Sequence, residues 1–353
     1  MKQSKSCIIP LLATGAAAQV VKPANFVPGV KWQIDIMASL DITKTLTPTD
    51  ALVWDLDLYH LQRHPDIITT LRSKIPNVSI ICYFNAGLAQ PSDCDWDTVW
   101  QKPEYKSLLG NSYDPPFSEE KWINIRNTTA IDLLKNRVTT AANLGCDGVD
   151  PDNIDGYSAD TGFNLNQQDY IKLMTTLATT AHGLKTKRGN TLLIGQKNAP
   201  ELVSSLNSVL DFAVLEDCKN LRNEADRAFC ADFQPYITQN KPVFSIEYPT
   251  SLRNKNSPQQ CNTSGANSAQ YTASCEIDSA VGGKRGNFKF SEILKLRDGA
   301  DESEHGELNG CTQYCGQGQG KGVVVTPVNE EIDGDECKPV SKSFKLMARE
   351  FAA

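Results

Sequence analysis

Four aspartates fall within nine positions of the segment GCDGVDPDNIDGY, residues 145 to 157. They are Asp147, Asp150, Asp152 and Asp155, and a short apolar run precedes them. Carboxylates at this density have three possible roles. They can coordinate calcium, they can act as acid, base or nucleophile in a hydrolase, or they can accept backbone hydrogen bonds in a solvated turn. The spacing of the residues and the elements around them decide among the three.

Spacing argues against calcium. The calcium-binding helix-loop-helix motif requires glycine at the sixth loop position and glutamate at the twelfth, and this segment has neither. Asp147 and Asp155 each precede a glycine, which is typical of carboxylates that accept hydrogen bonds in turns. Asp150 and Asp152 end an apolar run, where repulsion and burial cost free energy unless a cation or a substrate compensates. We therefore expect at least one of these two to be functional.

Polar residues end several other apolar runs in the same way. If the runs are parallel strands of a barrel, these residues lie at the carboxyl ends of the strands, where barrel active sites are found. Residues two apart share one side of a strand, so the pairs Asp55 with Asp57 and Asp150 with Asp152 each point one way. Salt bridges are the alternative role for the glutamates. The residues expected to converge on one face are Asp55, Asp57, Tyr83, Asn85, Asp150, Asp152, Lys197, Asn198, Glu216, Glu247 and Tyr248.

The apolar runs alternate with segments of helical spacing. This alternation predicts parallel strands, because parallel neighbours need a crossover connection. Thr128 or Thr129 is the expected cap of a helix that Gly145 ends, and Asn166 that of a helix that Gly183 ends. The predicted strands are KWQIDI (31–36), ALVWDLDL (51–58), VSIICYFNAG (78–87), CDGVD (146–150), TLLIGQKN (191–198), FAVLED (212–217) and PVFSIEY (242–248). The predicted helices lie at 64–74, 128–145, 166–184 and 199–211.

Seven such units within about 250 residues favour an α/β fold of the (β/α)8 TIM barrel type over an open doubly wound sheet. No glycine-rich dinucleotide fingerprint follows the first strand. Either NFKFSEILKL (287–296) or KGVVVTPV (321–328) supplies the eighth strand. The Ser-, Asn- and Gly-rich stretches after residue 250 indicate disulfide-tied loops that close the barrel, with a small appended binding module as the alternative.

The composition is that of an ordinary globular protein, with 353 residues, 40% of them hydrophobic and 22% charged. A net charge of -7 without a dense Lys or Arg run argues against a nucleic-acid partner and favours a cationic or neutral one. No stretch has the length of a bilayer span. We expect a monomer that needs no cofactor and no metal.

The first residues, MKQSKSCIIPLLATGAAAQ, combine Lys2 and Lys5 with a short apolar run and three small residues that end at Ala18. This order is typical of a secretory signal peptide, with cleavage expected near Ala18. We therefore expect a signal peptide at 1–18 and a single barrel domain at 19–353. The core of that domain is expected at about 28–300, and a Cys- and Gly-rich tail at 300–353.

Cysteine usage supports export. Removal of Cys7 with the signal leaves ten cysteines, an even number, which predicts disulfides in an exported protein. We expect Cys218 to pair with Cys230 and Cys261 to pair with Cys275, because each pair flanks a polar loop. The tail cysteines and their expected distant partner are Cys311, Cys315, Cys337 and Cys94.

Cys82 and Cys146 lie inside apolar runs, where buried free thiols that pack as small hydrophobic groups are expected. The CTQYC segment has no matching second half, so a zinc site is not indicated. Three glycosylation sequons, at Asn77, Asn127 and Asn262, are compatible with secretion.

Two separated carboxylates that face one pocket meet the requirement of glycosidic cleavage. One protonates the leaving oxygen, and the other attacks the anomeric carbon or activates water. The chain has no GxSxG elbow and only four histidines, so serine-hydrolase and multi-histidine metal chemistry are poorly supported. The residues therefore favour a glycosidase.

Eight short motifs follow one another along the chain: WDLDLY, ICYFNAG, WINIRN, GCDGVDPDNIDGY, TGFNL, QKN, LEDC and FSIEY. Together they resemble glycoside hydrolase family 114, the endo-α-1,4-polygalactosaminidases, over roughly residues 28 to 250. The resemblance implies a (β/α)8 barrel secreted by a fungus or bacterium. It also implies hydrolysis inside α-1,4-linked galactosamine polymers, such as the galactosaminogalactan of fungal biofilms.

The resemblance further implies that the catalytic carboxylates are an aspartate of DGVDPDN and Glu216 of LEDC. The choice between Asp150 and Asp152 stays open; Asp152 lies further out along the strand and is preferred as nucleophile, with Glu216 as general acid and then base. The family usually has NEQC where this chain has LEDC. Leu215 and Asp217 therefore depart from the family pattern, and the sugar subsites next to Glu216 are expected to differ in detail. The expected substrate-binding residues are Asp55, Asp57, Tyr83, Asn153, Asp155, Tyr157, Lys197, Asn198, Glu247 and Tyr248.

An acidic pocket suits a deacetylated, cationic galactosamine polymer, because carboxylates bind ammonium groups. Two other functions stay open. One is a glycosidase of the same fold that acts on neutral α-galactosides, and the other is a barrel that binds carbohydrate without turnover. Cleavage of defined oligomers distinguishes all three.

Overall fold

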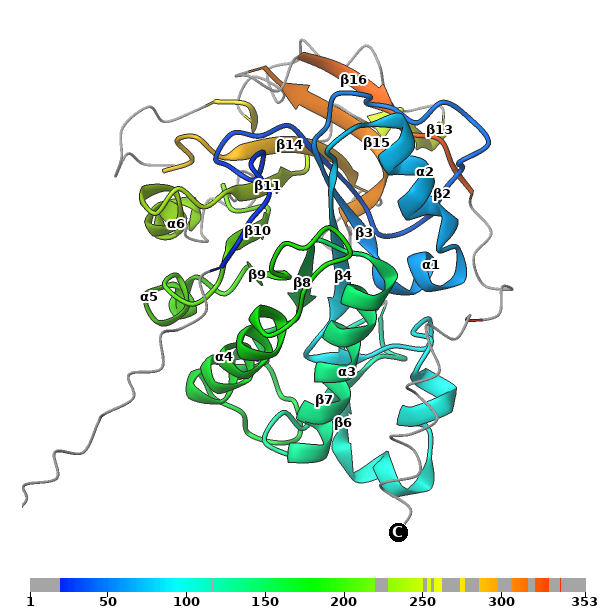
Figure 1. Ribbon diagram of the computed structural model, residues 1–353. Coiled ribbons are helices and arrows are strands. Elements are labelled where there is room, and N and C mark those ends of the chain that lie inside the picture. The colour runs from blue at the N-terminus through cyan, green and yellow to red at the C-terminus, as the bar shows by residue number, and fades with distance from the viewer. Residues whose placement is uncertain are drawn as a thin grey trace, which may run out of the picture.

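The structure, a computed structural model, describes residues 20–115, 117–219, 228–249, 253–254, 257–261, 274–276, 286–297, 306–316, 321–329 and 337. The expected signal peptide and Cys7 lie outside these residues. In the part that is described, eight parallel strands follow chain order across one curled sheet (Figure 1). This is the strand arrangement of a TIM-type barrel, so the predicted fold class is confirmed. The strands are β1 (Trp32–Asp35), β3 (Val53–Asp57), β4 (Ser79–Asn85), β8 (Gly148–Asp152), β9 (Leu193–Lys197), β10 (Phe212–Glu216), β11 (Val243–Glu247) and β14 (Ser291–Arg297).

The eighth parallel strand is β14, the first of the two candidate segments. The second candidate contributes β16 (Lys321–Val325), which is antiparallel to β15 (Gly306–Cys315), and β15 is antiparallel to β14. β15 also reaches the first strand: the Ile36 N–H donates to the Leu308 carbonyl at 2.9 Å, and the Tyr314 hydroxyl donates to the Trp32 carbonyl at 2.7 Å. An antiparallel hairpin therefore links the last parallel strand to β1.

Helices cover the outer face of the sheet between β3 and β11 (Figure 1). Asn127 caps the N-terminus of α3 with its side chain, one residue before the two threonines that were predicted. Gly145 ends α3 with a φ of 116°, and Asn166 caps α4 in a capping box with Asp169, both as predicted. The helices are α1 (Leu58–Arg63), α2 (Asp66–Lys74), α3 (Thr128–Leu144), α4 (Gln167–His182), α5 (Val203–Leu206) and α6 (Gln234–Thr238).

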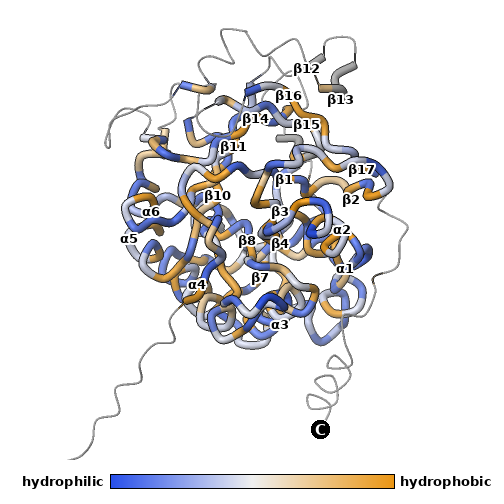
Figure 2. Tube along the Cα trace, turned by 45° about the horizontal axis from the view of Figure 1, so that its top comes forward, coloured by the Kyte–Doolittle hydropathy of each residue, from blue (hydrophilic) through white to orange (hydrophobic). Residues whose placement is uncertain are grey.

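Two hydrophobic layers follow from the alternation of side chains along the strands. Trp32, Ile81 and Phe244 pack inside the curl of the sheet, while Cys82 and Phe84 point outward and pack against the helices. Figure 2 shows hydrophobic stretches on these central strands. The inner layer fills the base of the barrel, so polar side chains at the carboxyl ends of the same strands stand on a rigid floor.

A long excursion between β4 and α3 forms a small sheet of its own, in the order β5-β7-β6. None of its elements was predicted, because its apolar runs are short and irregular. Its elements are β5 (Leu88–Ala89), the π-helix η1 (Trp96–Trp100), the 3-10 helix η2 (Pro103–Leu108), β6 (Leu109–Ser112) and β7 (Lys121–Ile123). We call this segment, residues 86–127, the β4–α3 insertion.

Short elements complete the described part of the chain. β2 (Ser39–Leu40) pairs with β17 (Val328–Asn329), and β12 (Arg253–Asn254) pairs with β13 (Ser257–Cys261). The remaining 3-10 helices are η3 (Gly156–Ser158), η4 (Pro200–Leu202) and η5 (Cys230–Phe233). The helix predicted at 199–211 is thus present only as the short turns η4 and α5. None of the helices described here is long and apolar enough to cross a membrane.

Five disulfides join the ten cysteines after Cys7. The predicted Cys218–Cys230 bridge is confirmed, and Cys94 does pair with a distant tail cysteine, Cys337. The prediction of free thiols at Cys82 and Cys146 was wrong. These two cysteines lie on and next to the neighbouring strands β4 and β8, with Cα atoms 6.0 Å apart, and they form a disulfide.

The predicted Cys261–Cys275 bridge was also wrong. Cys261 pairs with Cys311, and Cys275 pairs with Cys315. The two partners lie four positions apart on β15, and residues at an even spacing share one face of a strand. β15 therefore anchors both cysteines to the same side of the sheet, an arrangement that loop length alone does not indicate.

Candidate active site

Three strand ends bring Asp152, Lys197 and Glu216 together, as the last residues of β8, β9 and β10. Lys197 Nζ lies 2.8 Å from Asp152 Oδ2 and 3.5 Å from Glu216 Oε2. The Lys197 side chain is 1% exposed, whereas those of Asp152 and Glu216 are 16% and 29% exposed. A buried ammonium group therefore joins two carboxylates that both reach solvent.

A tyrosine hydroxyl supports each carboxylate. Tyr83 on β4 donates to Asp152 Oδ2 at 2.9 Å, and Tyr248, just after β11, donates to Glu216 Oε1. Burial, together with the charge of Asp152, raises the pKa of Tyr83 well above its usual value, so the hydroxyl stays a donor. A hydroxyl group from a neighbouring strand thus holds each carboxylate from the side.

The QKN motif positions this group from β9. Burial by itself would lower the pKa of Lys197, but the charges of Asp152, Glu216 and Asp150 outweigh burial and raise that pKa above its usual value. Lys197 therefore stays protonated. Asn198 follows with a φ of 43°, and its Oδ1 accepts the backbone N–H of Glu216 at 2.9 Å. The left-handed turn at Asn198 thus fixes the end of the next strand.

Asp55 and Asp150 are fully buried and lie deeper in the barrel than Asp152. Burial raises the pKa of Asp55 well above its usual value, and the charge of Asp150 raises it further. Burial also raises the pKa of Asp150 to about 7. In the described part of the chain no hydrogen bond to the oxygens of either carboxyl group is present, so a proton on one of the two would relieve the repulsion between them. Asp150 is accordingly a buried member of an acid pair, and Asp152 is the accessible carboxylate.

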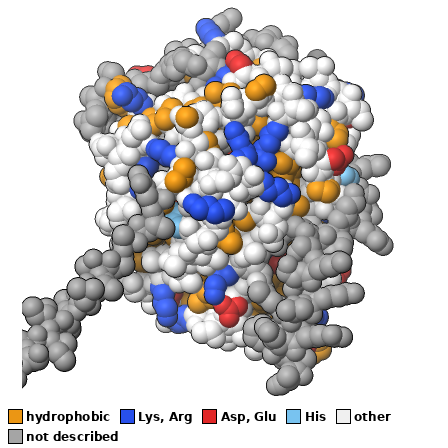
Figure 3. All heavy atoms as spheres, viewed as in Figure 1, with side chains coloured by type: hydrophobic (Ala, Val, Ile, Leu, Met, Phe, Trp, Pro, Cys, Tyr) orange, Lys and Arg blue, Asp and Glu red, His pale blue; other side chains and the backbone are white. Residues whose placement is uncertain are grey.

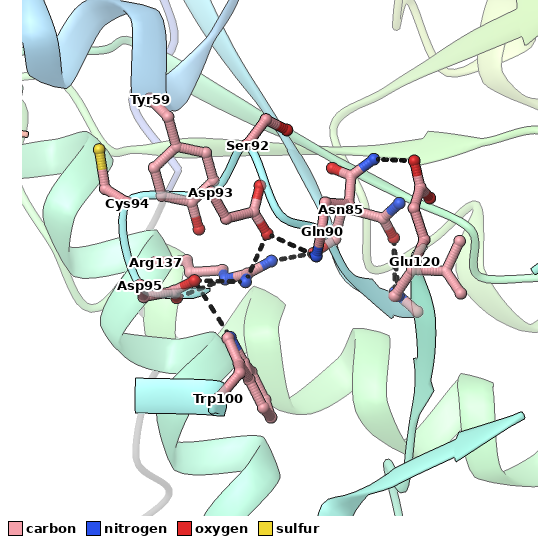
Figure 4. A network of polar contacts seen from close by, with 12 residues as sticks. Tyr59, Asn85, Gln90, Ser92, Asp93, Cys94, Asp95, Trp100, Glu120 and Arg137 are labelled. Atoms are coloured by element: carbon pink, nitrogen blue, oxygen red, sulfur yellow. Dashed lines mark hydrogen bonds and ion pairs between the residues drawn. The ribbon is translucent and has the colours of Figure 1, made fainter. Parts of the chain in front are cut away.

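Asn153 and Asn85 join β8 to β4 at the rim of the barrel. Asn153 has a φ of 54°, and its Oδ1 accepts from Asn85 Nδ2 at 2.7 Å. Arg137 of α3 donates to the Asn85 carbonyl at 2.5 Å and forms ion pairs with Asp93 and Asp95 at 2.8 and 2.7 Å. Figure 4 shows this guanidinium group in contact with both aspartates of the insertion. The network holds the rim next to Asp152 in place.

Asp155 and Tyr157 lie on the loop that follows β8. Asp155 lines a cavity of about 460 Å³ together with residues of the β4–α3 insertion. Burial raises the pKa of Asp155 to about 6, and the charge of Asp152 contributes. The Tyr157 hydroxyl donates to Glu201 Oε2 at 2.7 Å, and its ring packs edge-on against Tyr170. Asp155 therefore lies within electrostatic range of Asp152, whereas the Tyr157 side chain contacts Glu201 and Tyr170.

Two predicted residues are not brought to this group. Asp57 Oδ1 accepts the backbone N–H groups of Tyr59 and His60, both at 2.8 Å, and so caps α1. Glu247 is fully buried on the opposite side of β11 from Tyr248, because adjacent residues on a strand point to opposite faces. Its Oε1 accepts the Lys219 N–H at 3.2 Å.

Cys218, Cys230 and Glu247 offer their ligand atoms within 4.8 Å of one another. The two sulfur atoms form a disulfide, so they provide no thiolate for a metal ion. We therefore assign no metal site to this cluster.

Sequence reasoning missed the contribution of the β4–α3 insertion. Tyr113 and Trp122 line the cavity at Asp155, and Glu120 lies close enough to Asp152 to feel its charge. Burial raises the pKa of Glu120 to about 7, while its Oε1 accepts from Gln90 Nε2 at 2.8 Å. Trp122 begins the WINIRN motif. An aromatic residue in this otherwise polar segment was the sequence feature that could have indicated a contribution to the site.

Comparison with known proteins decides the family. The model of glycoside-hydrolase family GH114 matches residues 13–319 of the 353-residue chain. The chain belongs to this family. The GH114 chain is therefore a glycoside hydrolase, as the predicted carboxylates suggested. A search of curated proteins finds no match.

Solved structures extend the comparison. The GH114 chain is similar to Aspergillus fumigatus Ega3 in complex with galactosamine, with 28% identity and a TM-score of 0.59 over 79% of this chain and 96% of that one. It shows a weaker likeness to the glycoside hydrolase domain of PelA from Pseudomonas aeruginosa, with 12% identity and a TM-score of 0.45 over 62% of this chain and 83% of that one.

Proposed function

We propose that this GH114 protein cleaves internal α-1,4-galactosaminidic bonds in galactosamine-containing polysaccharide, with Asp152 as nucleophile and Glu216 as general acid and base. The observation that carries the proposal is the contact of both carboxylates with the single ammonium group of Lys197 at the carboxyl ends of adjacent strands. Glycosidic cleavage requires such a pair in one pocket. The likeness to a protein whose structure contains galactosamine supports the choice of sugar.

Asp152 is preferred to Asp150 because of access. Asp152 is partly exposed and forms an ion pair with Lys197, while Asp150 is fully buried and burial raises its pKa to about 7. A nucleophile must reach the anomeric carbon with a free carboxylate oxygen. Asp152 Oδ1 accepts the Asn153 N–H, and Oδ2 accepts from Tyr83 and Lys197, so Oδ1 is the oxygen with a lone pair left for attack.

The reaction proceeds in two steps. In the first, Asp152 attacks the anomeric carbon while Glu216 donates its proton to the leaving glycosidic oxygen, which breaks the C–O bond and leaves a glycosyl ester on Asp152. In the second, Glu216 takes a proton from water, and the water oxygen replaces the ester. The Tyr248 hydroxyl orients Glu216 throughout, and Lys197 stabilises the carboxylate that leaves.

Carboxylate separation supports net retention of configuration. The contacting oxygens of Asp152 and Glu216 touch the same nitrogen at 2.8 and 3.5 Å, so they cannot be farther apart than those two distances laid end to end. This limit is shorter than the separation of roughly 6.5 Å at which inverting glycosidases begin. A short separation of the two carboxylates favours the retaining, two-step reaction.

We also propose that the protein is secreted. Five disulfides are expected of a protein that folds in an oxidising compartment, and the N-terminal segment has the composition of a signal peptide. Of the three sequons, Asn77 is exposed, Asn127 caps α3 with its side-chain oxygen, and Asn262 lies outside the described residues. Mass spectrometry of the exported protein tests cleavage near Ala18.

The test compares the wild type with Asp152→Asn, Asp150→Asn and Glu216→Gln on partly deacetylated α-1,4-galactosamine oligomers. We expect internal cleavage by the wild type and a loss of at least about 1,000-fold in Asp152→Asn and Glu216→Gln, because each removes a group that takes part in bond breaking. Asp150→Asn should retain much more activity than Asp152→Asn. Mass spectrometry measures the products, and NMR of the first-formed anomer reports retention.

Exposed carboxylates provide matched controls: Asp132→Asn on α3 and Glu119→Gln in the insertion make the same chemical changes and should leave cleavage intact. Loss of activity in Asp150→Asn alone would transfer the nucleophile role to that residue. If galactosamine oligomers stay intact while neutral α-galactosides are cleaved, the substrate is a neutral α-galactoside. If the oligomers bind and none is cleaved, the protein is a carbohydrate-binding barrel.

A further inference from the structure

The amino ends of the strands form a second face of the barrel, opposite the carboxyl ends that carry the catalytic group. Helices between the strands end on this side, and the last carbonyl groups of a helix attract cations. At the end of α3, Arg72 Nη2 donates to the Gly145 carbonyl at 2.7 Å, and Lys187 Nζ donates to the Leu144 carbonyl at 3.0 Å. The topology therefore brings cations from separate segments to one end of the barrel.

Three of these cations surround the start of β8. Arg72 Nη2 and Arg188 Nη1 both approach Asp147 Oδ2, at 2.7 and 3.8 Å. A Cβ atom at Gly145 would lie 3.3 Å from Lys187 Cδ and 3.5 Å from Arg72 Nη1. Arg72 comes from the last turn of α2, whereas the other two come from the loop before β9. Side chains from two segments are thus neighbours here.

Two lysines extend this group along the same end of the barrel. Lys185 Nζ and the Val21 N–H both donate to Thr191 Oγ1, at 3.4 and 3.0 Å. Lys185 is therefore close to Lys22, whose Nζ donates to a carbonyl group just before β11 at 2.8 Å. Because Lys185 is two residues from Lys187, it connects the two groups of cations.

We call this patch the basic face. It consists of Lys22, Arg72, Lys185, Lys187 and Arg188. All of these except the half-buried Arg72 are exposed, and Lys and Arg side chains predominate on the face seen in Figure 3. The carboxylates that precede strands in this part of the described chain already have partners: Asp147 is buried between the two arginines, Asp211 accepts the Ile194 N–H at 2.9 Å, and Asp50 pairs with Lys31 at 2.8 Å.

The extent of the basic face indicates an extended partner. Its cations stand near the starts of β8, β9 and β11, and neighbouring strands of a sheet are about 4.8 Å apart. A single small anion cannot contact cations spread over several such intervals. The contacts with carbonyl groups also hold several of these side chains in place, so a partner loses less side-chain entropy on binding.

Charge density selects the class of polymer. Duplex nucleic acid carries one negative charge for about every 1.7 Å of its axis, which is much denser than the strand spacing that sets the positions of these cations. An acidic polysaccharide built from uronic acids carries one carboxylate on each sugar ring, which is closer to that spacing. Arg and Lys bind carboxylates through charge-assisted hydrogen bonds. Uronic-acid carboxylates therefore complement the basic face better than the phosphates of a duplex.

We propose that the basic face binds an acidic polysaccharide that carries a carboxylate on each sugar. The strands run from this face to the catalytic group, so an anionic polymer bound here leaves the carboxyl ends of the strands open to substrate. The protein is then held on an acidic matrix while its active site points away from it. This inference goes beyond the proposed hydrolysis and does not depend on the substrate that is cleaved.

The test measures binding of polygalacturonate oligomers to the full chain by calorimetry, with neutral galactan oligomers as the uncharged comparison. Removal of three exposed charges should weaken polygalacturonate binding about tenfold, because each exposed ion pair contributes little and three are lost together. Raised salt should weaken binding to the wild type as well. The variant with these changes combines Lys22→Gln, Lys185→Gln and Lys187→Gln.

A matched control variant makes the same chemical change at three exposed lysines elsewhere, two in the β4–α3 insertion and one on α4. It combines Lys102→Gln, Lys106→Gln and Lys172→Gln. Because both variants lose three positive charges, they differ only in where the charges are removed. The control should change polygalacturonate binding less than about twofold, since exposed charges away from the bound polymer are screened. Thermal unfolding checks that both variants are folded.

Three results would overturn the proposal. They are equal losses in the two triple variants, no binding of polygalacturonate by the wild type, and tighter binding of polyphosphate, duplex DNA or anionic phospholipid vesicles than of polygalacturonate. Cleavage of galactosamine oligomers should be unchanged in both variants. Polygalacturonate binding through the basic face of a protein that cleaves no galactosamine bond would support this inference and reject the proposed hydrolysis, so the two proposals fail separately.

Discussion

At the scale of single residues, the strongest physical anomaly is the pair of buried carboxyl groups Asp55 and Asp150. The folded protein keeps a proton on this pair near neutral pH, whereas the unfolded chain releases it above a pKa of about 4. The folded state therefore binds more protons, and the pair makes the protein less stable as the pH rises from about 4 toward 7 and above. An amide in place of one carboxyl group supplies the hydrogen bond without the proton.

We accordingly expect Asp55→Asn to gain stability relative to the wild type as the pH rises, by up to about 1.4 kcal/mol per pH unit between pH 4 and 7. At pH 4 the two proteins should unfold at similar urea concentrations. Urea unfolding at pH 4, 6 and 8 measures the difference, with the exposed substitution Asp66→Asn as the control. Parallel pH profiles for Asp55→Asn and the wild type would contradict a proton held on this pair.

At the scale of elements, Arg137 fastens the β4–α3 insertion to the barrel. Its guanidinium group is buried between Asp93 and Asp95 of the insertion, the Asn85 carbonyl of β4, and the rings of Tyr59 and Trp100. The insertion carries one wall of the cavity described above. Arg137 therefore helps to fix the orientation of that wall relative to the strand ends.

Arg137→Met should lower the free energy of unfolding by about 3 to 5 kcal/mol, because it leaves the buried Asp93 carboxylate without its partner. Adding Asp93→Asn to Arg137→Met should recover part of that loss, since the amide carries no charge to bury. Chemical unfolding of the single and double variants measures the coupling. If the double variant is less stable than the sum of the two single effects predicts, the ion pair does not explain the loss.

At the scale of the whole molecule, charge is distributed unevenly. The chain has a net charge of -7, yet Lys and Arg side chains gather on the face seen in Figure 3. The carboxylates of Asp152, Glu216 and Asp155 lie together at the strand ends and in the cavity beside them. A cationic polymer is therefore attracted toward the site and repelled by the basic face.

We expect the KM for deacetylated oligomers to rise about threefold to tenfold between 0.05 and 0.5 M NaCl, because salt screens the attraction between exposed charges. Fully acetylated oligomers should be cleaved poorly, and their KM should not respond to salt. Initial rates across a salt series measure both effects, with sucrose as an uncharged control solute. A KM that stays constant for the cationic substrate would argue that charge does not guide binding.

Local patterns were sufficient for the strands and for the residues that stand at their carboxyl ends. Each apolar run that ends in a polar residue is a strand with that residue at its carboxyl end, and Asp152, Lys197 and Glu216 occupy these positions. Gly145 and Asn166 end and begin helices as expected. These features depend on neighbours within a few residues, so they can be read along the chain.

Features that depend on distant residues required the tertiary structure. Cysteine pairing is one, because Cys82 meets Cys146 only after β4 and β8 are adjacent. The difference between Asp150 and Asp152 is another, because depth in the barrel and the position of Lys197 decide which of the two carboxylates is exposed and ion-paired. Spacing along the chain determined which residues stand at the strand ends; packing between segments far apart in sequence decided which of them meet, since pairing, burial and charge interactions act through space.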